Sequence, residues 1–259
     1  AQVRVVEEDG VRSLYLGSRL QSSWEVARPD DIAFLYVKLM GAALTAWPGM
    51  EKGLPARVLL IGLGGGSLCR HVAKYYPAYR VEAVELDPVV HECAVKYFGL
   101  SPKVEVHIAD GRAFLSEVRR MYDIILLDAF GEDYIPRELV TREFFQLVKS
   151  RLSPGGLLIA NTHMDVGSDE HERRTYHAVF GRYCELANPE QSGNRIILCG
   201  RDGLPDAASL KTRMARAGSA LGIREFDIIE LLRCMNGVDA VPGGEVLTDA
   251  NVHRLMKRR

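Results

Sequence analysis

The chain has few cysteines, and they follow no pattern. Its five cysteines are widely spaced, and no two of them form a Cys-x-x-Cys pair. This spacing argues against zinc-finger and dithiol redox motifs and favours free buried thiols over disulfides. The seven histidines are equally dispersed. We therefore predict that the protein has no metal site.

The sequence also lacks an excess of charge of either sign and lacks a long apolar segment. Its 33 basic and 34 acidic residues give 259 residues a net charge of −1, so no overall field would draw the molecule to nucleic acid or to an anionic membrane. No apolar run approaches the roughly 18 to 20 residues that span a bilayer, and no apolar signal core follows a charged start. We expect a cytoplasmic globular enzyme that binds neither nucleic acid nor membranes.

Glycine is concentrated at one point of the chain. Residues 58–67 read Val-Leu-Leu-Ile-Gly-Leu-Gly-Gly-Gly-Ser, so that a short apolar run ends abruptly at four glycines. A buried strand followed by a turn without Cβ atoms is typical of a nucleotide-binding loop at a helix N-terminus. We predict ligand contacts at Gly62, Gly64, Gly65 and Gly66. Taken alone, the pattern also suits a dinucleotide-binding loop or a simple turn.

From residue 57 onward, predicted strands and helices alternate, which is typical of βαβ units. Strands are expected at 57–61, 81–85, 104–108, 123–127 and 156–161, with helices at 67–76, 88–97, 111–120 and 137–152. This alternation predicts an α/β fold with a doubly wound, mainly parallel sheet. Other segments are expected to form a small β-meander at 3–26, a helix at about 32–47, a helix near 170–185, a strand at 195–199 and mainly helical structure at 207–234.

Acidic residues follow three of the predicted strands. Glu85 ends the second strand, 21 positions after Gly64, where a carboxylate can bind a ribose diol. Asp110 follows the third strand and Asp128 follows the fourth. A carboxylate at such a position can also simply cap the next helix. Because the carboxyl ends of parallel strands meet at one edge, we expect Glu85 to bind ribose, Asp110 to accept from an adenine amine and Asp128 to act at the reacting centre.

These patterns divide the chain into three parts. We expect an N-terminal β-meander at 1–28, a nucleoside-binding catalytic domain at 29–202 and a mainly helical extension of that domain at 203–259. The sequence has no internal repeat and no linker long enough to separate an independent domain. The meander is therefore expected to be an appendage of one catalytic unit.

Five segments together resemble the spermidine synthase family of polyamine aminopropyltransferases, which share the core of class I S-adenosylmethionine-dependent methyltransferases. They are residues 58–67, Val84-Glu-Leu-Asp-Pro, His107-Ile-Ala-Asp-Gly, Tyr122-Asp-Ile-Ile-Leu-Leu-Asp and Leu152-Ser-Pro-Gly-Gly. The resemblance spans about residues 12–200 and implies a Rossmann-like fold preceded by a small β-domain. It also implies decarboxylated S-adenosylmethionine as co-substrate, a small-molecule amine as acceptor, no metal and a homodimer.

The resemblance also implies roles for individual residues. The nucleoside would be held by Gln21, Glu85, Asp110 and Gly111. Asp128 would engage the attacking amine, and Tyr36 stands where the family has a tyrosine on the substrate side.

The sequence departs from the family at three acids that would bind a diamine. The aspartate of the family's Gly-Gly-Gly-Asp-Gly-Gly loop falls on Gly65. The second aspartate of its Asp-Ser-x-Asp-Pro segment falls on Gly131, and the glutamate two places after Tyr36 is Lys38. Without an acid at Gly65, nothing in the sequence selects decarboxylated S-adenosylmethionine over S-adenosylmethionine itself.

Four hypotheses follow. The first is aminopropyl transfer from decarboxylated S-adenosylmethionine to an amine, with Glu132 or Asp133 supplying a displaced acid. The second is methyl transfer from S-adenosylmethionine, because similar Gly-Leu-Gly-Gly-Gly-Ser-Leu segments occur in domains that resemble protein lysine methyltransferases. The third is a nucleoside-binding homologue without catalysis, suggested by the missing acids. A nicotinamide-dependent oxidoreductase is the fourth, and Ser67 at the third glycine of Gly-x-Gly-x-x-Gly argues against it.

Overall fold

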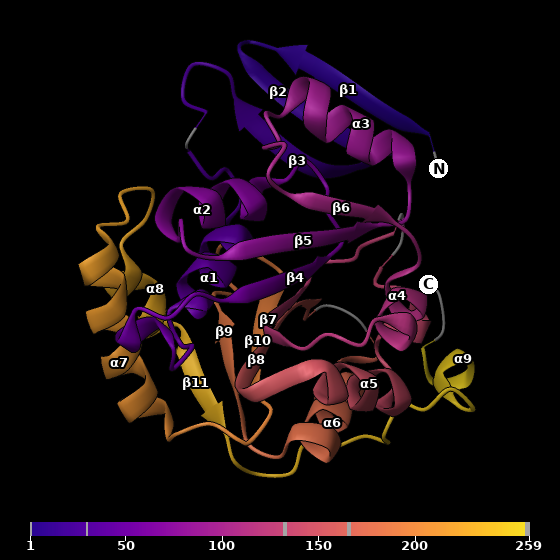
Figure 1. Cartoon of the computed structure of the whole chain (residues 1–259). Helices are drawn as coiled ribbons and strands as arrows, with labels where there is room; N and C mark the ends of the chain where they lie inside the picture. The colour runs from indigo at the N-terminus through magenta and orange to yellow at the C-terminus, as the bar shows by residue number, and fades with distance from the viewer. Residues whose placement is uncertain (1, 30, 132–133, 165–166, 257–259) are drawn as a thin grey trace.

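The computed structural model describes residues 2–29, 31–131, 134–164 and 167–256, so Glu132 and Asp133 lie outside the described residues. A three-stranded antiparallel sheet precedes an eight-stranded sheet with the strand order β11-β9-β10-β8-β7-β4-β5-β6 (Figure 1). The small sheet consists of β1 (Val3–Glu8), β2 (Val11–Leu16) and β3 (Arg19–Glu25). Its first turn contains Asp9 and Gly10, both with positive φ, as a tight hairpin requires. The predicted N-terminal meander is confirmed.

Five strands form the parallel part of the large sheet. They are β4 (Arg57–Ile61), β5 (Arg80–Glu85), β6 (Glu105–Ile108), β7 (Tyr122–Leu127) and β8 (Leu152–His163). The chain runs from β4 outward to β5 and β6, then returns to the other side of β4 for β7 and β8. This arrangement confirms the predicted doubly wound α/β fold. Its topological switch point, where α/β proteins bind ligands, lies between β4 and β7.

Antiparallel strands extend the sheet beyond β8. They are β9 (Tyr183–Ala187), β10 (Asn194–Gly200) and β11 (Met235–Val238). The helices are α1 (Leu35–Leu44), α2 (Ser67–Tyr75), α3 (Pro88–Tyr97), α4 (Gly111–Glu117), α5 (Arg142–Arg151), α6 (Asp169–Phe180), α7 (Ala207–Leu221), α8 (Ile228–Arg233) and α9 (Val252–Leu255), with short 3-10 helices η1 (Met50–Lys52) and η2 (Arg137–Leu139).

Strand β4 shows how the sheet divides the core. Alternate side chains point to opposite faces of a strand, and Val58 and Leu60 enter the core beneath α1, α2, α7 and α8. Leu59 and Ile61 enter a second core, which includes buried residues of α5 and α6. Because both faces are covered, every residue after Arg57 in this strand is buried and apolar.

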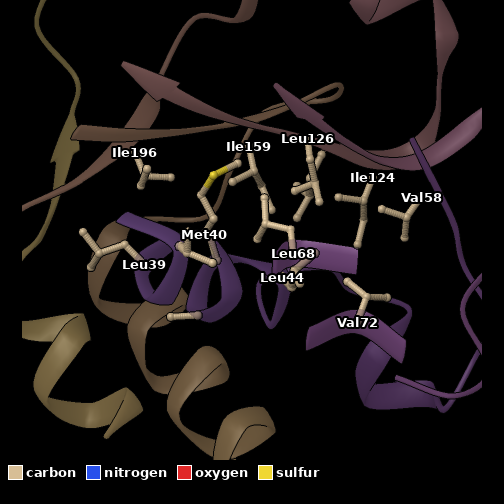
Figure 2. Packing of buried hydrophobic residues seen from close by; sticks show 14 of the residues in the cluster. Leu39, Met40, Leu44, Val58, Leu68, Val72, Ile124, Leu126, Ile159 and Ile196 are labelled. Carbon is tan, nitrogen blue, oxygen red and sulfur yellow. The ribbon is translucent and has the colours of Figure 1, made fainter. Parts of the chain in front are cut away.

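Helix α1 packs directly on one face of the sheet. Figure 2 shows its Leu39, Met40 and Leu44 beside strand residues that include Ile159 and Ile196. All three helix side chains are fully buried. This packing fixes the start of α1, and therefore Tyr36, at the carboxyl ends of the parallel strands.

The N-terminal sheet packs on α3 through a third cluster of apolar residues. Leu14 of β2 contacts Val90 and Phe98 there, and Trp24 of β3 packs against the same cluster. The sheet is thereby held over the loop that follows β4, which brings residues of β3 into the ligand-binding region.

Two predicted helices differ from the structure. The segment 137–152 is not one helix, because Thr141 interrupts it and its Oγ1 accepts a hydrogen bond from the Phe144 amide (3.3 Å) at the start of α5. The helix predicted at 170–185 ends at Phe180. Gly181 follows with φ 73° and ψ −134°, a conformation that favours glycine, and β9 begins two residues later.

Strand β8 also differs from the prediction. The segment Ser153–Gly156 was expected to stop the chain before a strand, but β8 already pairs with β7 at Leu152. The register then shifts by several residues before pairing resumes at Leu157, with Gly155 at φ 72°. These residues therefore form an irregularity within the strand.

Strands β9 and β11 were not predicted, and β11 lies within the segment expected to be mainly helical. No helix within the four described ranges is long and apolar enough to cross a membrane.

Candidate active site

A cleft of about 1960 Å³ lies at the carboxyl ends of the parallel strands. Its walls come from β2, β3, α1, the segments after β4 to β8, and the region of η2 and α9. Eight of the ten predicted site residues line it: Gln21, Tyr36, Gly62, Gly64, Glu85, Asp110, Gly111 and Asp128. Among the described residues, Gly65 and Gly66 do not line the cleft.

Gly62 lies where the glycine loop approaches the end of β7. Its φ is 91°, and a Cβ atom at this position would lie 2.3 Å from the Asp128 carbonyl oxygen. Residue 62 must therefore be glycine both for its backbone conformation and for this close approach. The nucleotide loop and Asp128 are consequently held against each other.

The backbone amides of the loop are largely bonded within the protein. The Gly65 amide donates to Ser22 Oγ (2.7 Å), and the Gly66 amide donates to the Leu63 carbonyl (2.9 Å). A Cβ at Gly65 would lie 2.8 Å from Ser22 Cβ. Instead of offering these amides to a ligand, Gly65 and Gly66 allow the loop to pack closely against β3 and Leu100.

Glu85 is held rigidly at the end of β5. One carboxylate oxygen accepts the Leu63 amide (2.9 Å), and the other accepts the Asp87 amide (3.0 Å). Two backbone donors orient the carboxylate while leaving a lone pair on each oxygen for a ligand. The geometry supports the predicted contact with a diol.

Asp110 caps a helix and also lines the cleft. Its Oδ1 accepts the Ala113 amide (2.8 Å) and caps α4, while the residue also lines the cleft. The next residue, Gly111, is buried, and a Cβ there would lie 2.5 Å from Ile61 Cγ2. Helix α4 can therefore begin close to the end of β4, which brings Asp110 to the cleft.

Gln21 of β3 carries an unpaired polar atom at the cleft. Its Nε2 is buried and has no hydrogen-bond partner within the described part of the chain. A buried donor without a partner costs about 1–3 kcal/mol. An acceptor on a bound molecule, such as a ribose oxygen, would satisfy it.

Asp128 is the acid next to the switch point. Its Oδ1 accepts a hydrogen bond from Asn161 Nδ2 (2.9 Å), and the Tyr36 hydroxyl hydrogen-bonds to the same carboxylate. Burial raises the pKa of Asp128 to about 7, although both hydrogen bonds act to lower it. Burial, followed by the charge of Asp128, raises the pKa of Tyr36 well above its ordinary value. Tyr36 is thus a hydrogen-bond donor, and Asp128 can exchange a proton near neutral pH.

Tyr134 is a cleft residue that the sequence did not single out. Its hydroxyl donates to Glu172 Oε2 (2.9 Å) and accepts from the His163 amide (3.3 Å). Glu172 is fully buried, and burial raises its pKa to about 7 against the lowering effect of hydrogen bonds from Ser168 and Tyr134. Only tertiary structure brings these residues together, so no local sequence signal could have identified them.

The positions of the missing family acids differ in exposure to the cleft. Gly131 lines it, whereas Lys38 and Gly65 do not within the described part of the chain. Asp128 is flanked by the amide side chain of Asn161. Glu132 and Asp133, the two acids expected to replace a missing one, lie outside the described residues.

One group in the described ranges could hold a metal ion, and it lies away from the cleft. It consists of Glu82, Glu105 and His107 on β5 and β6. Glu82 already accepts a hydrogen bond from the Tyr122 hydroxyl (3.0 Å) and pairs with Arg120 (3.1 Å). Arg120 and Tyr122 therefore already balance the charge and hydrogen bonding of the Glu82 carboxylate.

Comparison with known proteins relates this chain to a family of transferases. A family model described as the spermine/spermidine synthase domain matches residues 38–190. A polyamine aminopropyltransferase of Vibrio vulnificus is 40% identical over 212 residues, which cover 79% of this chain and 69% of that protein.

Solved structures show the same fold. The structure of a probable spermidine synthase from Corynebacterium glutamicum aligns with 99% of this chain and 92% of its own, with a TM-score of 0.73 at 19% sequence identity. The structure of human methyltransferase-like protein 13 in complex with SAH aligns with 78% of this chain and 93% of its own, with a TM-score of 0.63 at 29% identity.

Proposed function

Because the chain belongs to the spermine/spermidine synthase family, we propose that this transferase moves an aminopropyl group from decarboxylated S-adenosylmethionine to a small-molecule amine. The observation that carries the proposal is the pairing of Asp128 with Tyr36 and Asn161 beside the glycine loop of a member of this family. A carboxylate in this position can bind an ammonium group and then accept its proton.

The nucleoside would lie across the ends of β4, β5 and β6. Glu85 would accept hydrogen bonds from the ribose hydroxyls, Gln21 would donate to the sugar through its unpaired Nε2, and Asp110 would accept from the adenine amine. Gly62 and Gly64 would let the ligand approach the backbone. Gly65 and Gly66 would contribute indirectly, by allowing the loop to pack against β3 and Leu100.

The sulfonium nucleoside supplies an electrophilic methylene carbon. The amine nitrogen bonds to this carbon as the carbon–sulfur bond breaks, and the electron pair of that bond remains on sulfur as methylthioadenosine is released. Asp128 orients the amine and takes its proton, while Tyr36 donates a hydrogen bond to the carboxylate. The chain's own contribution is thus orientation and proton transfer.

Titration calorimetry with decarboxylated S-adenosylmethionine, S-adenosylmethionine and methylthioadenosine tests donor choice directly. We expect preference for the decarboxylated form and tight binding of methylthioadenosine. Incubation with decarboxylated S-adenosylmethionine and a panel of amines should then release methylthioadenosine. Absence of release with every amine would refute aminopropyl transfer.

Methyl transfer on the same scaffold is the second candidate, and Gly65 favours it. The residue that would be an aspartate in the family has no side chain here, and Ser22 fills the adjacent space. Preference for S-adenosylmethionine in the titration, with S-adenosylhomocysteine as product, would establish this alternative. Binding without turnover across both donors would instead indicate a non-catalytic homologue.

Two further expectations stay predictions. A homodimer would be identified by light scattering coupled to gel filtration. The cytoplasmic location would be checked by cell fractionation.

A further inference from the structure

A series of hydrogen-bonded polar side chains connects Ser192 to Asp128. Ser192 Oγ donates to Asn194 Oδ1 (3.0 Å), Asn194 Nδ2 donates to Asn161 Oδ1 (3.0 Å), and Asn161 Nδ2 donates to Asp128 Oδ1 (2.9 Å). All four residues line the cleft. In each of these three hydrogen bonds, the donor is on the side away from Asp128 and the acceptor is on the side toward it.

The pairing of β8 with β10 explains why these residues meet. In this antiparallel pair, Asn194 lies opposite His163, and Asn161 lies opposite Ile196. Asn161 and His163 are two positions apart on β8, so they and Asn194 lie on the same face of the sheet. Asn194 is consequently the diagonal neighbour of Asn161, within reach of its side chain.

The donor-to-acceptor direction of these hydrogen bonds follows from the chemistry of the groups. An ionised carboxylate only accepts hydrogen bonds, so Asn161 must present its NH₂ group to Asp128 and its carbonyl to Asn194. Asn194 must then present its own NH₂ group to Asn161 and its carbonyl to Ser192. The Ser192 hydroxyl accepts the Asn194 backbone amide (3.1 Å), and its own hydrogen is left to donate to that carbonyl.

A reversed amide would place like groups together. If Asn161 turned over, its carbonyl would face the Asp128 carboxylate and its NH₂ group would face the NH₂ group of Asn194. Asn161 is only 1% exposed, so water cannot readily relieve either contact. These hydrogen bonds therefore stabilise the ionised form of Asp128 and fix one of its oxygens. The other side of the carboxylate faces Tyr36 and the cleft.

We propose that Asn194 and Ser192 are positioning residues for Asp128, acting through Asn161 to orient its carboxylate and keep it ionised for reaction with the amine. The catalytic part of this inference rests on the proposed function, whereas the effect on Asp128 itself does not.

Other ionisable groups at the cleft can also affect the pKa of Asp128. Tyr36 of α1 contacts the carboxylate directly. The remaining ionisable groups that line the cleft within the described residues are Tyr15 of β2, Arg19 of β3, Glu85 and Asp87 at the end of β5, Asp110 after β6, Tyr134, Arg137 and Glu138 after β7, His163 at the end of β8, and His253 and Arg254 of α9. None of these is changed in the variants below.

The test measures the pKa of Asp128 in the free protein by carbon-13 NMR of labelled aspartate, with Asp128→Asn identifying the signal. Asn194→Ala and Ser192→Ala should each raise this pKa by at least about half a unit, because donors to the carboxylate are lost or misaligned. Ser192→Thr, which keeps the hydroxyl, should retain the wild-type value. Gln191→Ala is the matched control, since Gln191 precedes Ser192 and also lines the cleft but takes no part in these hydrogen bonds.

The kinetic readout is the pH dependence of turnover. The acidic limb of kcat should move to higher pH by the same amount in Asn194→Ala and Ser192→Ala, while the affinity for methylthioadenosine stays within about two-fold. A pKa of Asp128 unchanged in folded Ser192→Ala and Asn194→Ala would overturn the inference. If wild-type protein turns over no donor while the pKa shift still occurs, the proposed function fails and the positioning of Asp128 stands.

Discussion

Replacing Asp128 by asparagine changes one atom and removes one charge. Asn161 donates to Oδ1 of the carboxylate, and an asparagine carbonyl can accept the same bond. The other oxygen becomes an NH₂ group, which cannot accept a proton and would repel an ammonium group. The substitution should therefore preserve the fold while removing the chemistry assigned to the carboxylate.

Two contributions set the size of the expected loss. The first is the lost hydrogen bond between the carboxylate and the ammonium group of the amine. Such a bond to a charged group contributes about 1.5–3 kcal/mol, and each 1.36 kcal/mol corresponds to about a tenfold change in rate. Loss of a general base costs roughly a hundredfold to ten-thousandfold. We therefore expect turnover to fall at least about a hundredfold. Glu85, Gln21 and Asp110 are unchanged, so the affinity for the nucleoside should stay within a few-fold.

Methylthioadenosine release, measured by chromatography, gives the turnover, and calorimetry gives the nucleoside affinity. The wild-type rate should also decline as the pH falls through about 7, because protonation of Asp128 removes the base. A variant as active as the wild type would refute the role assigned to Asp128.

The same substitution has a predictable effect on stability. The pKa of Asp128 in the folded protein is about 7, above its ordinary value of 3.8, because the carboxylate is buried. Between these two values the folded state binds more protons than the unfolded state, so the free energy of unfolding falls as the pH rises through this range. Asp128→Asn lacks this decrease and should gain stability relative to the wild type between pH 4 and pH 8. Thermal melts at both pH values would check the sign.

Substitutions at Gln21, Gly62 and Gly65 test the ligand-binding region further. Gln21→Ala should weaken methylthioadenosine binding by roughly 5- to 150-fold, the equivalent of one hydrogen bond of about 1–3 kcal/mol, as measured by calorimetry. Gly62→Ala should lower the melting temperature and turnover together, because it meets the Asp128 carbonyl, whereas Gly155→Ala has a similar positive φ with nothing within 4 Å and should lower stability only slightly. Gly65→Asp should destabilise the protein through contact with Ser22, and the double variant Ser22→Gly/Gly65→Asp should recover part of the melting temperature, because it removes this contact together with the acceptor of the residue-65 amide.

Local sequence signals predicted the parts of the site that depend on strand ends. Glu85 ends β5, Asp110 comes two residues after β6 and Asp128 directly follows β7, and the parallel sheet brings those strand ends to one edge. Asp110 illustrates why two interpretations can both hold, because one oxygen caps α4 while the residue also faces the cleft.

Features that depend on distant partners were not predictable in the same way. The glycine pattern could not show that Gly65 bonds to Ser22, 43 positions earlier in the chain. Strand β9 follows Gly181, which was the available signal that the preceding helix ends. Strand β11 gave less signal, since its residues Asn236 and Gly237 are poor strand formers and pair only because β9 presents an edge.

The bond between Ser22 and the glycine loop links ligand binding to the local unfolding of the N-terminal sheet. If β1 to β3 separate from α3, Gln21 leaves the cleft and the Gly65 amide loses its acceptor. A nucleoside that requires Gln21 would then bind only the closed form, and at a hundred times its dissociation constant it would oppose this opening by about 2.7 kcal/mol. Exchange of the β3 backbone amides should therefore slow as nucleoside is added. The stability of the N-terminal sheet would thus report whether the site is occupied.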